Sequence, residues 1–148
     1  MNLYVESSAV LAWLLKETSA PTMQEMLERA EFIAASDLTL VECDRALIRA
    51  ETLGQLSQLE AGQRRALLEA TSLRWTLLRI EDEILERARR RFPQEPLRAL
   101  DSIHLATALT ARAALPDLAL LSLDGRVREN GAALGFDVFP ERPPGLDA

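Results

Sequence analysis

Apolar residues in this chain occur either as short continuous runs or as stripes with helical spacing. The short runs predict strands at residues 2–5, 32–35, 75–80, 118–123 and 136–139. The stripes predict intervening helices at residues 9–16, 20–29, 38–53, 58–70, 81–91, 97–115 and 126–134. Because strands alternate with helices, the pattern predicts an α/β fold with a parallel sheet covered on both faces.

Local signals mark several ends of the predicted helices. Ser57 and Glu60 have the spacing of a capping box, and Ser7 with Ser8 offers an N-cap before residues 9–16. Gly54 and Gly135 stand just beyond two helices, where a C-terminal glycine is common. These signals support the helix boundaries independently of the hydrophobic pattern.

Length and composition are those of an ordinary globular protein. The chain has 148 residues, of which 48% are hydrophobic and 27% charged. We expect one domain over residues 1–140 and a Pro-rich tail over residues 141–148, since no repeat or linker interrupts the chain. No apolar run reaches the ~18 residues of a membrane span, and the N-terminus lacks the basic region of a signal peptide. The single cysteine, Cys43, is compatible with a reducing cytoplasm, the location we expect.

The charge balance argues against general nucleic-acid binding. The net charge is −6, whereas most such binders are basic. The cations are almost all arginines, with Lys16 the only lysine, and arginine is well suited to phosphate contacts. Arg45 and Arg49, close to Glu42, are therefore candidates for guiding a phosphate group.

Four carboxylates occupy positions where burial or an element end would make an unpaired charge destabilising or place it at a ligand site. Asp101 lies in a helix that is apolar nearly all round, and Asp124 ends a buried strand. Glu6 ends the first strand, and Glu42 lies near the start of its helix, where the dipole favours an anion. Each acid alone also fits an ordinary role, such as a turn before Gly125, a helix cap or an ion pair, but one acid at each such place suggests a shared site.

A cluster of carboxylates needs a cation among its members. Neighbouring carboxylates raise one another's pKa, and oxygen-only ligands select Mg²⁺ or Mn²⁺ over zinc. Such a metal can activate a water for attack on a phosphodiester and stabilise the developing charge. The acids therefore point to metal-dependent phosphodiester hydrolysis.

Four segments carry a family resemblance: LYVESSAV at the start, LTLVECDRAL around Glu42, LRALDSIHLATAL around Asp101, and LLSLDGRVRENGAALGFDV around Asp124. Together, over residues 2–139, the chain resembles the VapC-type PIN domains, and LRALDSIHLATAL is the most specific piece. The resemblance implies a three-layer α/β/α sandwich and Mg²⁺- or Mn²⁺-dependent cleavage of RNA. It also implies a type II toxin–antitoxin system, with a VapB-like antitoxin and a homodimer.

By position in these segments, the resemblance implies that the catalytic acids are Glu6, Glu42, Asp101 and Asp124. It also implies that Glu6, Asp101 and Asp124 bind the metal. Ser8 and Ser122 match hydroxyls beside the acids. His104, three residues after Asp101, is a supporting candidate that could hold Asp101 or substrate, or could simply be a satisfied core histidine.

One departure leaves an alternative open. The family's first acid is normally aspartate, and the longer Glu6 could weaken Mg²⁺ binding or shift preference towards Mn²⁺. The alternative function is a catalytically weak or inactive PIN fold that binds RNA or protein. A phosphoacceptor domain is disfavoured, because its chemistry needs a lysine near the site and Lys16 lies inside the first helix.

Overall fold

A five-stranded parallel sheet forms the centre of the computed structural model, which describes residues 1–142. The strands are β1 (Asn2–Val5), β2 (Phe32–Ser36), β3 (Thr76–Leu78), β4 (Ala119–Leu121) and β5 (Val138–Phe139), in the order β3-β2-β1-β4-β5. The predicted parallel sheet is thus confirmed. Most of the predicted Pro-rich tail, residues 143–148, lies outside the described residues.

Helices connect the strands in the predicted order. They are α1 (Ser7–Leu14), α2 (Ala20–Arg29), α3 (Asp37–Thr52), α4 (Gln58–Ser72), α5 (Asp82–Ala88), α6 (Ala99–Ala114) and α7 (Gly125–Ala133). The Ser57–Glu60 capping box is present, with both of its hydrogen bonds 3.1 Å long. Gly54 and Gly135 adopt positive φ angles of 74° and 88°, as expected for residues that end helices.

The first helix begins earlier than predicted. Its N-cap is Glu6, which makes no side-chain capping bond, and the helix already includes Ser7 and Ser8. Both serine hydroxyls bond to carboxylates instead of capping the backbone. The serines that looked like a cap are therefore part of the candidate site.

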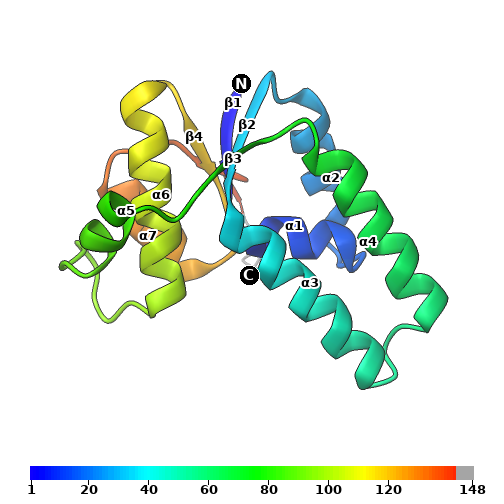
Figure 1. Ribbon diagram of the computed structural model, residues 1–148. Coiled ribbons are helices and arrows are strands. Elements are labelled where there is room, and N and C mark those ends of the chain that lie inside the picture. The colour runs from blue at the N-terminus through cyan, green and yellow to red at the C-terminus, as the bar shows by residue number, and fades with distance from the viewer. Residues whose placement is uncertain (143–148) are drawn as a thin grey trace.

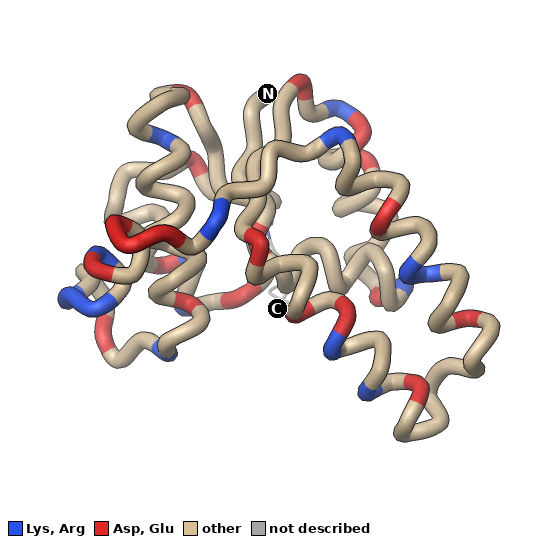
Figure 2. The backbone as a smooth tube through the Cα atoms, in the orientation of Figure 1, with Lys and Arg blue, Asp and Glu red and all other residues tan. Residues whose placement is uncertain are grey.

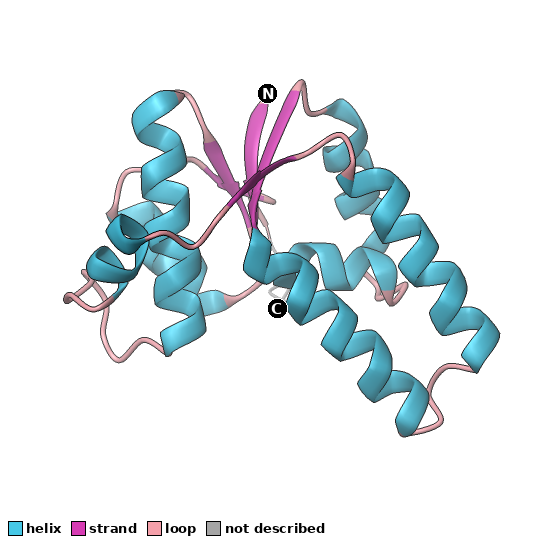
Figure 3. Cartoon of the chain, in the orientation of Figure 1, coloured by secondary structure: helices cyan, strands magenta, loops and turns pink. Residues whose placement is uncertain are grey.

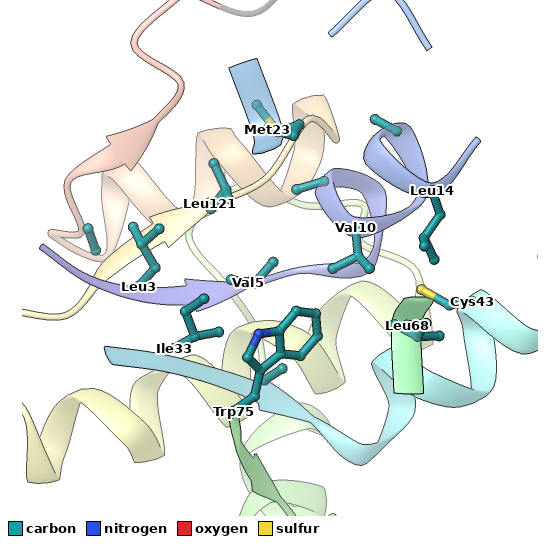
Figure 4. Packing of buried hydrophobic residues seen from close by; sticks show 14 residues of the cluster. Leu3, Val5, Val10, Leu14, Met23, Ile33, Cys43, Leu68, Trp75 and Leu121 are labelled. Carbon is teal, nitrogen blue, oxygen red and sulfur yellow. The ribbon is translucent and has the colours of Figure 1, made fainter. Parts of the chain in front are cut away.

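Helices cover both faces of the sheet, giving three layers (Figure 1, Figure 3). Strand residues that alternate in sequence face opposite layers, as the pleat requires. Leu3 and Val5 pack with residues of α1 to α4, and the labelled side chains of this cluster are drawn in Figure 4. Tyr4, between them, packs with residues of α5, α6 and α7. The α/β/α sandwich is the observed fold.

The strand order creates a switch point beside β1. From β1 the chain moves outward through β2 to β3 and then returns to form β4 and β5 on the other side. Ligand sites of parallel sheets lie at the carboxyl ends of the strands at such a point. Glu6 directly follows β1, and Ser122 directly follows β4, so the fold brings these two residues together.

Among residues 1–142, none of the helices combines the length and the hydropathy needed to cross a membrane.

Candidate active site

Glu6 is held at the carboxyl edge of the sheet by its backbone and by two hydroxyls. Its backbone N–H donates to the carbonyl of Leu121, the last residue of β4, at 3.0 Å. Its carboxylate Oε2 accepts a hydrogen bond from Ser122 Oγ at 2.8 Å and a second from Ser8 Oγ. Glu6 is only 4% exposed, so the two serines fix its orientation. Both hydroxyls that the sequence singled out thus lie beside the first acid.

The same hydroxyls order the segment that carries Asp124. The backbone N–H groups of Leu123 and Asp124 donate to Ser8 Oγ at 2.8 Å and to Ser122 Oγ at 3.1 Å. Asp124 is also the N-cap of α7, accepting from the N–H of Val127 on Oδ1 at 3.0 Å. The Asp-Gly pair, which suggested a turn, is in fact the start of α7, and the cap uses only one carboxylate oxygen of Asp124.

The second oxygen of Asp124 faces Arg98, which also binds Asp101. Arg98 Nε donates to Asp101 Oδ2 at 3.0 Å, and Arg98 Nη2 donates to Asp124 Oδ2 at 3.3 Å. The Asp101 carboxylate raises the pKa of Arg98. Asp101 and Asp124 thus lie on either side of one guanidinium. The sequence analysis missed Arg98, although its spacing of three residues from Asp101 is a signal for a helical ion pair.

Glu42, on α3, joins a buried chain of polar groups. Its Oε1 accepts hydrogen bonds from His104 Nε2 at 2.5 Å and from Ser7 Oγ at 2.8 Å. On the other side of the imidazole, His104 Nδ1 lies 3.0 Å from the hydroxyl of Tyr4. His104 is 1% exposed, so its ring is fixed on both sides.

These contacts decide between the roles left open for His104 and Glu42, and His104 is a buried histidine satisfied by its neighbours. His104 hydrogen-bonds to Glu42 and Tyr4 and not to Asp101, and its Nε2 lies 4.0 Å from Glu6 Oε1. Glu42 pairs with His104, and within residues 1–142 neither Arg45 nor Arg49 forms an ion pair with it. Arg45 and Arg49 are exposed on α3. The sequence did not indicate that Tyr4 and Ser7 contribute to the site, because their partners are remote in the chain.

The surroundings of Glu6 and Glu42 shift the pKa values of these two acids in opposite directions. Burial raises the pKa of Glu6, although His104 and the two serine hydroxyls oppose it. Burial also acts to raise the pKa of Glu42, but the hydrogen bond and charge of His104, with help from Ser7 and Arg98, bring it below the usual range. Glu42 therefore holds its negative charge more readily than Glu6.

Cys43, beside Glu42, takes no part in this chemistry. It belongs to the apolar cluster around α1, and burial raises the pKa of its thiol to about 12. A thiol with such a pKa is not a nucleophile at neutral pH, so Cys43 serves as a packing residue.

The acids form two adjoining groups, one around His104 and one around Arg98. Among residues 1–142 no three His, Cys, Asp or Glu side chains are arranged to hold a metal ion as they stand. The donor chemistry nevertheless fits a hard divalent cation, because Glu6, Asp101 and Asp124 offer only carboxylate oxygens at one edge of the sheet. Arg98 occupies the position between two of these acids.

Charges elsewhere are spread over both helical layers, with a basic group just beyond α5 (Figure 2). The group around the end of α5 consists of Arg87, Arg89, Arg90 and Arg91. Two of these arginines already contact other side chains. Arg90 pairs with Glu86 at 2.7 Å, and the guanidinium of Arg87 lies 4.2 Å from the centre of the Phe92 ring. The exposed arginines of α3 remain the better candidates for phosphate contacts near the acids.

Comparison with known proteins identifies relatives along most of the chain. A family model described as PIN domain matches residues 3–132. The chain is 32% identical over 139 residues to Ribonuclease VapC35 from Mycobacterium tuberculosis. The aligned region covers 92% of this chain and 94% of that protein.

Solved structures show the same fold at low sequence identity. VapC20 from Mycobacterium tuberculosis, a sarcin-ricin loop cleaving toxin, superposes with a TM-score of 0.65 at 15% identity, over 91% of this chain and 96% of that one. The structure of VapBC2 from Rickettsia felis bound to a promoter DNA fragment gives a TM-score of 0.62 at 12% identity. The match covers 93% of this chain and 97% of that chain.

Proposed function

The chain belongs to the PIN-domain family, and from this premise we propose that it is a divalent-metal-dependent endoribonuclease and the toxin of a type II toxin–antitoxin pair. The observation that carries the proposal is that Glu6, Glu42, Asp101 and Asp124, from four separate segments, lie in two adjoining groups at the switch point of the sheet. The similarity to a protein named a ribonuclease supports the reaction class.

Glu6, Asp101 and Asp124 would hold the metal, Mg²⁺ or Mn²⁺. When bound, the metal would supply Lewis-acid stabilisation of the phosphate and a more acidic water. Ser8 and Ser122 hold Glu6 Oε2 in place for this role. The oxygen-only donors and their position at one sheet edge support this set of ligands.

Glu42 is the proposed proton acceptor. Its Oε1 already accepts from His104 and Ser7, so Oε2 is the oxygen that would take a proton from the attacking water. This carboxylate is ionised at neutral pH and so can accept a proton, and its lowered pKa makes it a weaker base than Glu6, whose pKa is raised. His104 acts as a positioning residue, because it fixes the acid without reaching the substrate.

RNA, a VapB-like antitoxin and a second copy of the chain are the proposed partners. Arg45 and Arg49, exposed on α3, would contact RNA phosphates. The fold likeness to VapBC2 supports the antitoxin. We further propose residues 1–140 as one PIN-like domain, residues 141–148 as a tail, and a cytoplasmic location, for which the buried free thiol of Cys43 is suitable.

RNA degradation in Mn²⁺, compared with EDTA, tests the proposal. Asp101→Asn should lower the cleavage rate by about 100-fold or more, because metal stabilisation of the transition state is worth several kcal/mol. Asp117→Asn is the matched control, since Asp117 precedes β4 at the opposite edge of the sheet and bonds only to Asn2 among the described side chains. Equal cleavage by wild type and Asp101→Asn would refute the proposed site.

A non-catalytic PIN fold that binds RNA or protein is the second candidate. It is favoured by Glu6, which replaces the aspartate normal in the family, and by Arg98 between two of the acids. Titration of the metal-free protein with Mn²⁺ and Mg²⁺ separates the two functions. Failure to bind either ion, together with retained RNA binding, would support the non-catalytic function.

A further inference from the structure

Arg98 makes an unusual connection for a surface arginine. It is the N-cap residue of α6, and its side chain is 68% exposed, whereas those of Asp101 and Asp124 are 10% and 25% exposed. One planar guanidinium donates through Nε to the first acid and through Nη2 to the second. Arginine is the side chain best shaped for such a bridge.

The two oxygens that Arg98 occupies belong to proposed metal ligands. Both contacts use Oδ2, and the only other hydrogen bond of these carboxylates within the described residues is the capping bond of Asp124 Oδ1. A divalent cation placed between the two acids would meet a positive guanidinium within a few ångströms, and like charges at that distance repel. Arg98 and the metal therefore exclude one another at this position.

We propose that Arg98 is a built-in counter-cation for Asp101 and Asp124, which a divalent metal must displace in order to bind. In the metal-free protein the guanidinium balances the charge of the pair, and it sets a threshold for the metal concentration that fills the site. The inference rests on the proposed metal-dependent function.

The difference in burial indicates that Arg98, and not Asp101 or Asp124, moves when a metal binds. The acids are anchored, Asp101 within α6 and Asp124 as the cap of α7. Arg98 ends in solvent and can rotate away while its backbone still caps α6. The exchange therefore requires one exposed side chain to move and leaves the fold intact.

Calorimetric titration of the full chain, stripped with EDTA, with MnCl₂ alone tests the inference. Arg98→Met should bind Mn²⁺ about 10-fold more tightly than wild type, equivalent to ~1.4 kcal/mol. Its melting temperature should be lower than that of wild type in EDTA and should rise more on addition of Mn²⁺. Arg98→Lys keeps the charge without the planar fork, so its affinity should fall between the two.

Arg29→Met is the matched control. Arg29 is also an exposed arginine in a helical ion pair, with Glu25 at 2.9 Å, but α2 ends near the start of β2, at the opposite edge of the sheet. It should bind Mn²⁺ like wild type.

The outcomes separate this inference from the proposed function. If wild type and Arg98→Met bind Mn²⁺ equally, the counter-cation role is wrong and the metal-dependent function stands. If neither binds Mn²⁺, both fall. If Arg98→Lys binds Mn²⁺ as tightly as Arg98→Met, competition by the positive charge is excluded.

Discussion

Glu42 Oε1 lies 2.5 Å from Nε2 of His104, although 62 positions separate the two residues in the chain. The contact joins α3 to α6 across the carboxyl edge of the sheet. The Tyr4 hydroxyl, 3.0 Å from His104 Nδ1, extends the chain of hydrogen bonds into β1. A single buried imidazole thus ties together three elements that carry the candidate site.

Replacing His104 should therefore destabilise the protein strongly. His104→Ala leaves Glu42, Ser7 and Tyr4 without a shared partner in a buried setting, and we expect a loss of ~2–4 kcal/mol in the free energy of unfolding. Urea denaturation measures it. Ile103→Val, the neighbouring position on α6, should cost only ~1 kcal/mol. A His104→Ala variant as stable as the Ile103→Val variant would show that the network contributes little.

Glu6 and Glu42 should give opposite dependences of stability on pH. Because burial raises the folded-state pKa of Glu6, its ionisation disfavours folding, and the wild type loses stability as pH rises through that pKa. Glu6→Gln should therefore unfold at higher temperature than wild type at pH 7 in EDTA, and this advantage should vanish at low pH.

Glu42→Gln is the counterpart. The folded-state pKa of Glu42 is lowered, against the effect of burial, by His104 and its other partners. Its stabilising contribution is present above the unfolded-state pKa and lost as pH falls through the folded-state value. Glu42→Gln should melt below wild type at pH 7, and the difference should close on acidification. The same sign for both variants in thermal melts would contradict the assigned environments.

Arg45 and Arg49 should contribute to RNA affinity through charge. In the Asp101→Asn background, each alanine substitution should weaken RNA binding and lower the slope of log K against log salt by about 0.7 for a single-stranded contact. Fluorescence anisotropy at several salt concentrations measures the slope. Arg29→Ala is the control, and an equal change in that variant would assign the effect to net charge alone.

Two glycines in helices should respond to alanine in opposite directions. A Cβ at Gly131 on α7 would press into the Leu120 side chain, which is fully buried and cannot move aside freely. Gly131→Ala should cost ~1–3 kcal/mol. Gly62 on α4 has nothing within 4 Å of an added Cβ, and Gly62→Ala should gain ~0.5–1 kcal/mol. Denaturation of both variants checks how closely α7 packs on β4.

The sequence was sufficient to predict the elements and the positions of the acids at their ends. Apolar runs are a strong signal for buried parallel strands, and Glu6 and Asp124 follow directly from where two such runs stop. The resemblance of the motif implied that Ser122 lies beside the acids, but not that its partner is Glu6. Strand and helix ends moved by a few residues, because capping bonds and not hydrophobicity decide them.

The partners of the acids could not be predicted in the same way. The pairing of His104 with Glu42 depends on how α3 and α6 approach each other across the sheet, which no local pattern encodes. Ser7 looked like a helix cap, because serine before a helix usually is one. The pairing of Arg98 with Asp101 could have been predicted, since the two residues are three positions apart. The second bond of Arg98, to Asp124, is a tertiary contact between residues 26 positions apart.

The position of β1 in the middle of the sheet has a consequence for protein synthesis. Glu6 is synthesised more than 110 positions before its companions Ser122 and Asp124, which come after β4. A nascent or truncated polypeptide that stops before residue 118 would lack them. The chemistry proposed for this edge therefore requires a chain made at least through β4 and the residues that follow it.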